Sequence, residues 1–215
     1  EHERPVLVAT VAVGMGVDRG DVGLVLHLDL PATPEGYLQE SGRAGRDGKP
    51  AHCQVLFSPG DRTSLGWAMR ASAWSSDALE DRGRLDLAQQ QLRRMEAVAE
   101  GEMCREQALL LAVGELVGSC GRCDRCVDSP KRRDWSDQVE TLLAHLAEQD
   151  GTEMRRLGEH LALHESGRHD RWTWLARRLV QEELIQESND GAQRLYLRES
   201  GRRFLDSPWP LDYAA

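Results

Sequence analysis

Two arginines on a glycine-rich segment carry the clearest chemical signal in this chain. The segment from Gln39 to Gly48 has the sequence Gln-Glu-Ser-Gly-Arg-Ala-Gly-Arg-Asp-Gly and places Arg43 and Arg46 three positions apart. Arginine carries a permanent charge on a planar fork that matches phosphate oxygens, and small neighbours let a ligand approach the backbone closely. The segment predicts a turn that reaches a phosphate, although the same composition also suits an ordinary exposed turn.

Four of the five cysteines give a second chemical signal. Cys120, Cys123 and Cys126 are spaced by three, and Cys104 lies upstream of them. Four thiolates complete a tetrahedral zinc site and leave no position for water, so the pattern predicts a structural Zn²⁺ ion. Unpaired or disulfide-bonded cysteines and an iron–sulfur cluster are the alternatives.

The fifth cysteine and the arginines of the cysteine loop have simpler interpretations. Cys53 lies on an apolar segment, where we expect it to pack in the core. Arg122 and Arg125 alternate with the cysteines, so we expect their charges to offset part of the thiolate charge.

The composition is that of a globular protein with room for one large domain or two to three small ones. The 215 residues are 40% hydrophobic and 29% charged, and no apolar stretch approaches the ~20 residues of a membrane helix. We therefore expect an intracellular protein with no membrane partner. The net charge of -9 weighs against nucleic acid, but the carboxylates crowd residues 77–106 whereas arginines recur over residues 155–203. A nucleic-acid partner stays open.

The N-terminal third has an α/β pattern. Aliphatic and β-branched runs predict buried strands over residues 4–10, 23–29 and 51–57, and a helix is expected from Pro34 to Gly42. Parallel strands need both faces covered, and three strands with one helix are too few. We therefore expect an incomplete sheet in a chain that begins within a domain.

The rest of the chain is expected to be mainly helical. A three–four apolar spacing over residues 85–99 predicts one arm of a helical hairpin, and a polar, basic linker is expected at residues 130–134. Beyond it, the pattern predicts three helices, the first capped by Ser136, followed by a hairpin turning at residues 189–191. Three helices and a hairpin make a winged helix.

Two segments resemble known helicase motifs. Residues 8–18, Val-Ala-Thr-Val-Ala-Val-Gly-Met-Gly-Val-Asp, resemble motif V of superfamily two helicases, and residues 37–48 resemble motif VI. The four cysteines and the winged helix that follow narrow the resemblance to the RecQ family of DNA helicases. It extends from about residue 5 to about residue 205.

The resemblance implies a fold and a domain order. We expect an α/β, partial RecA-like sheet, then an α-helical zinc-binding module, then an α+β winged-helix domain. The corresponding boundaries are residues 1–62 for the end of the second RecA-like domain, 63–130 for the zinc-binding module, 131–206 for the winged helix and 207–215 for a tail that is loose or loosely docked.

The resemblance also assigns roles to individual residues of the motor segment. Arg46 matches the arginine finger that reaches the γ-phosphate of ATP, and Arg43 matches its companion near the nucleotide. Gln39 matches the residue that links the nucleotide and DNA states. The motif V matches are Gly16 and Asp18 near the nucleotide and Thr10 at the DNA phosphate backbone.

The third predicted helix would contact duplex DNA. Its apolar spacing places a set of basic and aromatic side chains on the outward face, and the resemblance makes that face a DNA surface. The expected contacts are Arg171, Arg177 and Arg178, with Trp174 stacking on DNA or packing against the zinc-binding module, and Asn189 at the tip of the wing.

The implied activity is that of a 3'–5' DNA helicase that couples hydrolysis of ATP, with Mg²⁺, to unwinding in DNA repair or recombination. The motor would hold single-stranded DNA, in the bacterial cytoplasm at the nucleoid or otherwise inside the cell. The sequence contains no P-loop and no Asp-Glu-x-His box, so we expect hydrolysis only with an upstream RecA-like motor domain. The alternatives are a stand-alone DNA-binding module and a zinc-dependent winged-helix transcription factor.

Overall fold

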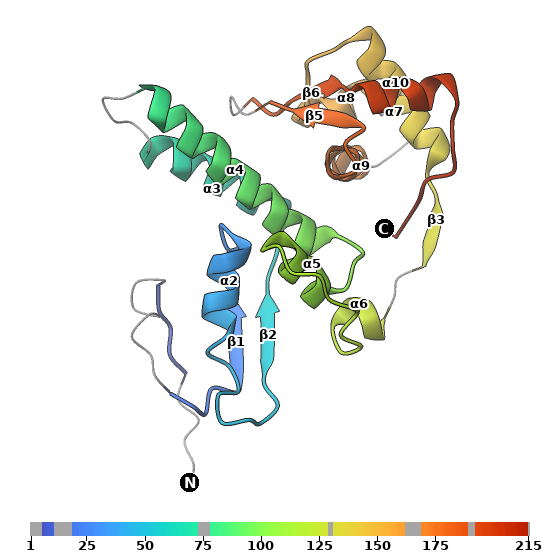
Figure 1. Ribbon diagram of the computed structural model, residues 1–215. Helices are drawn as coiled ribbons and strands as arrows, with labels where there is room; N and C mark the ends of the chain where they lie inside the picture. Colours follow the sequence, from blue (N-terminus) through green and yellow to red (C-terminus); the bar gives the residue numbers. More distant parts are fainter. Residues whose placement is uncertain are drawn as a thin grey trace. The chain divides into compact units, whose positions relative to one another are not determined.

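The computed structural model describes most of the chain in two units (Figure 1). The units divide at Val127, with Glu1–Val127 in the first and Asp128–Ala215 in the second. No helix in the described part is long and apolar enough to cross a membrane. The described residues are 6–10, 19–72, 78–128, 131–161, 169–188 and 192–214.

A parallel strand pair lies in the first unit. Strand β1 (Leu24–His27) pairs with β2 (His52–Val55), with Leu24 opposite His52. Parallel strands need a crossover, which helix α2 (Pro34–Ser41) provides. Two of the three predicted strands are confirmed as strands, but their predicted burial is wrong, because the residues of β1 and β2 are exposed or half-buried. The strand predicted over residues 4–10 is wrong for residues 6–10, which are exposed and pair with no strand in the described part.

Helix α2 begins and ends where the sequence predicts. The Thr33 hydroxyl accepts a 2.9 Å hydrogen bond from the amide of Gly36, and Pro34 occupies the first turn, where its missing N–H costs nothing. Gly42 closes the helix by donating from its amide to the Leu38 carbonyl. The helix therefore has a fixed start and stop directly before the arginine turn.

Four helices complete the first unit: α3 (Pro59–Ser72), α4 (Ala78–Glu100), α5 (Arg105–Ala112) and the short α6 (Asp124–Val127). Helices α3 and α4 form the predicted hairpin. A buried ion pair between Arg62 of α3 and Glu96 of α4, 3.0 Å apart, joins the two helices. One core joins this hairpin to α2 and α5, and its buried members are Leu30, Tyr37, Leu92, Met95, Val98 and Leu109.

The second unit contains helices and a three-stranded antiparallel sheet. Its helices are α7 (Ser136–Glu148), the 3₁₀ turn η1 (Met154–Arg156), α8 (Leu157–Leu161) and α9 (His169–Gln181). The strand order is β4 (Thr152–Glu153), β6 (Arg194–Leu197), β5 (Ile185–Glu187). The predicted three helices and hairpin are confirmed, and the structure as a whole is mixed α/β.

The predicted basic linker at residues 130–134 is wrong for residues 132–134, and the C-terminal tail, predicted as loose or loosely docked, is docked by strand pairing. Residues Arg132–Asp134 form strand β3, which pairs antiparallel with β7 (Asp212–Ala214). Tyr213 of β7 is 2% exposed, and its burial anchors the C-terminal segment on the unit. Helix α10 (Glu199–Asp206), which the sequence analysis did not predict, precedes this segment.

The N-terminus of α7 also differs from the prediction. Ser136 is the first residue of the helix rather than its cap. The carboxylate of Asp134 accepts hydrogen bonds from the Ser136 amide at 2.8 Å and hydroxyl at 2.6 Å. The same hydroxyl accepts from the amide of Leu211 at 3.0 Å, so the start of α7 is tied to the C-terminal segment.

Gly201 allows α10 to lie close to the sheet. A Cβ there would overlap the Leu184 carbonyl oxygen and lie 2.6 Å from Cδ1 of Leu197. Gly201→Ala is expected to lower the free energy of unfolding of the second unit by about 1–3 kcal/mol, because overpacking outweighs the gain of ~1 kcal/mol in helix propensity. Urea unfolding measures this. Gly83→Ala in α4, where a Cβ meets nothing within 4 Å, is the control and should not destabilise the protein.

Candidate metal centre and arginine turn

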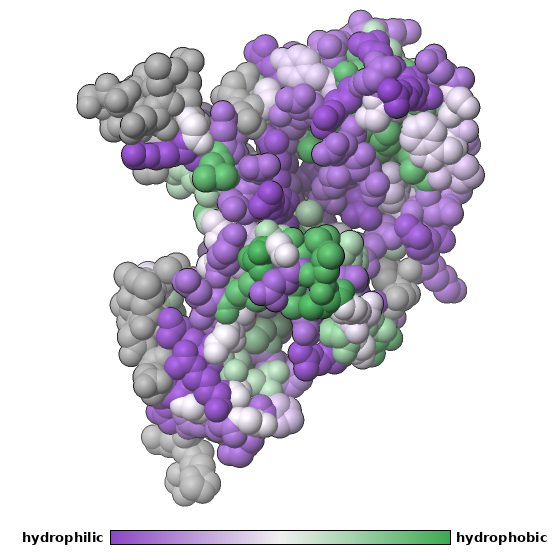
Figure 2. Space-filling view, viewed as in Figure 1, coloured by the Kyte–Doolittle hydropathy of each residue, from purple (hydrophilic) through white to green (hydrophobic). Residues whose placement is uncertain are grey.

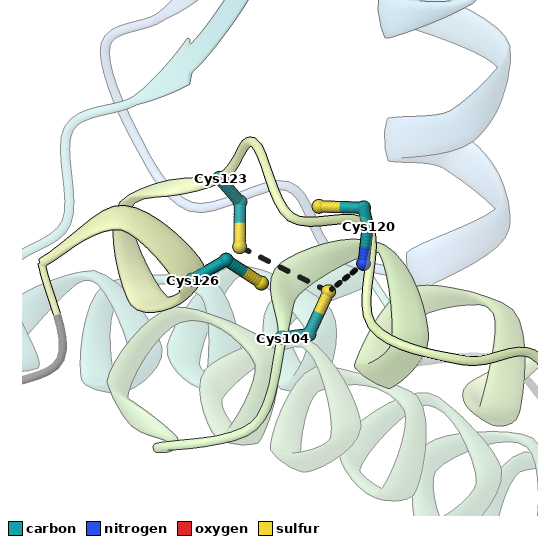
Figure 3. Close-up of side chains that lie close together, drawn as sticks. All are labelled: Cys104, Cys120, Cys123 and Cys126. Atoms are coloured by element: carbon teal, nitrogen blue, oxygen red, sulfur yellow. Dashed lines mark hydrogen bonds between the residues drawn. The ribbon is translucent and has the colours of Figure 1, made fainter.

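The four predicted metal ligands converge at one point. The sulfur atoms of Cys104, Cys120, Cys123 and Cys126 all lie within 4.8 Å of one another, and those of Cys104 and Cys123 are 3.9 Å apart (Figure 3). A zinc ion with Zn–S bonds of about 2.3 Å places tetrahedral sulfurs about 3.8 Å apart. The arrangement fits zinc, and the cluster is a structural zinc site.

Local backbone geometry holds the ligands in place. Cys104 directly precedes α5, and its sulfur accepts a 3.2 Å hydrogen bond from the amide of Cys120. The amide of Arg105 donates to the sulfur of Cys123 at 3.4 Å. Gly121 has φ +70, a conformation that glycine adopts without strain, and lets the loop turn between two ligands.

The surroundings favour thiolates at two of the ligands. Burial raises the pKa of the Cys104 thiol, but hydrogen bonds from the amides of Cys120 and Gln107 oppose it and bring the pKa down to about 6. Burial also raises the pKa of the Cys123 thiol, but hydrogen bonds from the amides of Arg105 and Cys126 outweigh this effect, so the pKa is lowered. A hydrogen bond to Cys123 raises the pKa of Cys126 to about 12. A bound zinc ion displaces the proton, since only thiolates ligate it.

Arginine side chains near the cysteines form ion pairs. Arg122 pairs with Glu106 at 2.7 Å on the surface. The Arg105 guanidinium pairs with Asp124 at 2.7 Å, which lowers the pKa of that carboxyl. Arg122 also interacts with Cys120, in line with the prediction for this arginine. Sequence analysis missed Arg105, although its position directly after Cys104 could have drawn attention to it.

The arginine turn follows α2 and is fixed to the chain before β1. The amide of Gly45 donates to the Val22 carbonyl and that of Asp47 to the Gly20 carbonyl, both at 3.0 Å. Gly45 has φ +67, and a Cβ there would lie 2.9 Å from the Lys49 carbonyl oxygen. Glycine is therefore required at this position for steric as well as conformational reasons.

The turn exposes the residues that the motif predicts as functional. Arg46 and Gln39 are exposed, and Arg43 is half-buried. Behind them, Nε2 of His27 on β1 lies 2.6 Å from a carboxylate oxygen of Glu40 on α2, and the His27 ring packs against Tyr37. The sequence analysis missed this pair, which ties the helix that carries Gln39 to the strand beneath it.

Of the other motor residues, Thr10 is exposed, while Gly16 and Asp18 lie outside the described residues. Cys53 was expected to be buried on β2, and this is wrong, because its side chain is exposed. Cys53 lies opposite Val25, on the face of the two-stranded sheet that is turned toward α2, and its thiol donates to the Ser41 carbonyl at 3.6 Å. The other face of the sheet exposes Leu24 and Leu26 of β1.

The predicted outward orientation of Arg177 and Arg178 on α9 is wrong. Their exposed fractions are 6% and 9%. Strand β7 covers this side of the helix, where the Arg178 guanidinium lies 5.3 Å from the ring centroid of Tyr213. The error follows from treating the C-terminal segment as loose. Asn189 lies outside the described residues.

An aromatic cluster joins β3, α9 and β7. Trp174 packs against Trp135, with ring centroids 4.9 Å apart, and against Tyr213 at 6.2 Å. Two guanidinium groups lie over the Trp135 ring, that of Arg171 at 4.5 Å and that of Arg133 at 5.2 Å. Both of these packing partners of Trp174 belong to its own unit. Cation–π contacts hold both arginines at the edge of this cluster.

Exposed apolar side chains gather beside residues 120–126, which carry three of the cysteines and are called the metal loop below. Figure 2 shows them over α5 and the segment that follows it, where Leu111, Leu116 and Val117 are 46%, 88% and 38% exposed. Apolar surface of this kind marks contact sites on proteins. The metal loop therefore lies next to a candidate contact surface.

Two family models match the chain in the order that the fold suggests. The helicase conserved C-terminal domain matches residues 1–48, which include the arginine turn. The RecQ zinc-binding family matches residues 60–127, which include α3, α4, α5 and the four cysteines.

Named relatives agree with these matches. The ATP-dependent DNA helicase RecQ of Bacillus subtilis is 35% identical over 143 residues, which are 66% of this chain and 23% of that protein. The protein of the same name from Haemophilus influenzae is 38% identical over 133 residues, 60% of this chain and 20% of that protein. Helicase Q4 of the mouse is 53% identical over 73 residues, 34% of this chain and 6% of that protein. The chain spans about a fifth of the length of the two bacterial relatives. It belongs to the RecQ family of helicases, and matches the C-terminal helicase and zinc-binding segments of that family.

Proposed function

We propose that this chain is part of a RecQ-type 3'–5' DNA helicase that couples ATP hydrolysis to unwinding in DNA repair or recombination. The observation that carries the proposal is the arginine turn, which is fixed by backbone hydrogen bonds to residues 20 and 22 on a unit whose core continues into the zinc-binding helices. A transcription factor has no use for such a turn. Relatives named as helicases support the same function.

In this proposal Arg46 is the arginine finger and Arg43 its companion. The glycine turn directs Arg46 outward, so the group can reach a nucleotide on another surface. Gln39 would relay between nucleotide and DNA, with Thr10 on the DNA backbone and Gly16 and Asp18 near the nucleotide. ATP and Mg²⁺ would be held by a P-loop motor domain.

The face of the β1–β2 sheet that α2 does not cover supports contact with further parts of a motor domain. Leu24 and Leu26 on β1 and Leu56 after β2 are 54%, 45% and 46% exposed. A parallel sheet is stable when both of its faces are buried. We therefore propose that the rest of a RecA-like domain covers this face, with residues 1–62 as its C-terminal part and residues 63–130 as the zinc-binding module.

We propose that the second unit is a winged helix and contacts DNA. Its three helices and β5–β6 hairpin support this proposal. Because Arg177 and Arg178 are buried, we place the proposed DNA contact at Arg171 and Arg133 instead. Their guanidinium groups share one tryptophan ring, so they can reach one phosphate or two neighbouring phosphates of a strand.

The double variant Arg133→Gln, Arg171→Gln tests this contact. Its affinity for duplex DNA is expected to fall, and the slope of log K against log salt to flatten by about two units, because each phosphate contact contributes about 0.9. Fluorescence anisotropy over a salt series measures both. The control, Arg202→Gln with Arg203→Gln on α10, removes the same charge from exposed positions. Equal slopes for the two variants would rule out the contact.

The proposed helicase function has its own test. A polypeptide that joins this chain to a RecQ P-loop motor domain is expected to hydrolyse ATP when DNA is present and to unwind a duplex with a 3' single-stranded tail. The same polypeptide without residues 6–48 should do neither, since it lacks the arginine turn. DNA binding with no hydrolysis in the joined polypeptide would favour a stand-alone DNA-binding module instead.

A further inference from the structure

Two arginines that lie next to metal ligands in sequence cap the C-terminus of α4. The last four carbonyls of an α-helix have no partner within the helix. In α4 the first of these, that of Ala97, accepts from the amide of Gly101 at 2.8 Å. The Arg105 guanidinium donates to the carbonyls of Val98 and Ala99, the latter at 2.9 Å. The Arg125 guanidinium donates to the carbonyl of Glu100 at 3.2 Å. All four carbonyls are therefore satisfied.

Each capping arginine is adjacent to a metal ligand. Arg105 follows Cys104, and Arg125 precedes Cys126. The positive charges also lie at the helix end where the dipole favours them. The position of both guanidinium groups thus depends on the backbone that the metal holds together.

Arg105 further connects the two ends of the cysteine cluster. Its guanidinium forms a two-pronged pair with Asp124, with Nε 2.9 Å from one carboxylate oxygen and Nη2 2.7 Å from the other. A planar fork makes this pair and the carbonyl contacts at once, which a lysine cannot do. Arg105 therefore joins Cys104, the Cys123–Cys126 segment and the end of α4.

We propose that Arg105 and Arg125 are positioning residues that make zinc binding and the order of the α4 C-terminus depend on each other. Zinc fixes the four cysteines and the backbone beside them, this backbone carries Arg105 at the start of α5 and Arg125 in α6, and the two arginines cap α4. The coupling also acts in reverse, because the capped helix holds Arg105, whose amide donates to the ligand sulfur of Cys123. This role rests on the metal site and not on the proposed helicase activity.

The coupling has a route to the arginine turn. Val98, whose carbonyl Arg105 caps, packs in the core that also contains Tyr37 of α2 and Leu109 of α5. Disorder at the end of α4 would loosen the packing beneath α2. Residues 34–41 are therefore expected to respond to zinc, whereas α7 in the second unit is not.

Arg105→Gln tests the proposal in the zinc-loaded chain, with Arg122→Gln as the matched control. Both changes remove one charge from the neighbourhood of the cysteines. The Arg122 side chain pairs with Glu106 and interacts with Cys120, but in the described contacts it does not cap α4. Two quantities are measured: the rate of zinc release to a chelator and hydrogen exchange over residues 93–101.

For Arg105→Gln, release is expected to accelerate ~10–100-fold, the range for residues that support metal ligands, and exchange over residues 93–101 to rise in step. Arg125→Gln should also raise exchange there, since its guanidinium donates to the carbonyl of Glu100. Arg105→Lys should recover only part of the loss. Behaviour of Arg105→Gln equal to that of Arg122→Gln would overturn the proposal.

A second measurement covers the case in which Arg105→Gln does not fold. Zinc is removed from the unaltered chain by a chelator, and exchange is followed by segment. Higher exchange at residues 93–101 and 34–41, with α7 unchanged, is the expected result. Exchange that rises in residues 120–127 alone would show that the metal orders only its own loop, and the proposal would be wrong.

Discussion

Replacing Cys104 with serine is expected to abolish stoichiometric zinc binding and cooperative unfolding of the first unit. Cys104 is 6% exposed, lies at the start of α5 and is the one ligand distant in sequence from the others. Its loss leaves three ligands on one short segment, with no metal bond to the start of α5. Structural zinc contributes an apparent 10–16 kcal/mol, roughly, in small zinc domains at neutral pH. That is comparable to the whole stability of a typical domain, about 5–15 kcal/mol.

Metal content by elemental analysis and thermal unfolding by circular dichroism check this prediction. One zinc per chain is expected before the substitution and far less than one after it. Cys53→Ser is the control, because Cys53 is an exposed cysteine outside the cluster and should keep both the metal and the melting curve. Full zinc retention by Cys104→Ser would exclude Cys104 as a ligand. Iron in place of zinc in anaerobically purified protein would support the cluster alternative.

The metal ligands could be predicted from sequence because thiolate coordination depends on residue type and short spacing. Three of the four ligands lie within seven residues, and the fourth opens a helix. The cap on α4 could not be predicted in the same way. The cap requires the Arg105 guanidinium to reach carbonyls that precede it in the sequence and also Asp124, which follows it by 19 residues. Only the folded structure brings these groups together.

In the second unit, local patterns predicted the helices and the hairpin but not what covers them. The apolar face of α7 was predicted, and Val139, Leu142 and Leu146 are fully buried. The burial of Arg178 was not, because it requires Tyr213 to return across α9 from the other end of the unit. A three-residue strand such as β7 has no sequence signal strong enough to distinguish it from a loose tail.

The arginine turn shows the same division. Its glycines and the limits of α2 follow from short-range steric rules and were predicted well. The His27–Glu40 pair that supports it joins two elements across a crossover, so no local pattern indicates it. The function of Arg46 depends on a nucleotide held by another domain. Only a kinetic experiment on a joined polypeptide can therefore measure its contribution.

In a polypeptide that joins this chain to a RecQ P-loop motor domain, Arg46→Ala is expected to lower kcat for DNA-stimulated ATP hydrolysis by ~10³-fold or more. The loss corresponds to about 4 kcal/mol of transition-state stabilisation. An arginine finger neutralises charge that develops as the phosphoryl group is transferred, so the Kd for ATP and the affinity for DNA should change little. Arg46→Lys should recover a small part of the rate, because it restores the charge but not the planar fork.

Arg19→Ala is the matched control for Arg46→Ala. Arg19 is an exposed arginine of the same unit that pairs with Asp21 at 2.8 Å, and its loss removes an equal charge. Its kcat should stay near that of the unaltered polypeptide. Gly45→Ala offers an independent test, since its Cβ would meet the Lys49 carbonyl oxygen and displace the turn while Arg46 remains. Loss of kcat in Gly45→Ala as well as in Arg46→Ala would tie catalysis to the position of the guanidinium. A rise in KM for ATP with kcat unchanged in Arg46→Ala would instead make Arg46 a ground-state contact and contradict the arginine finger.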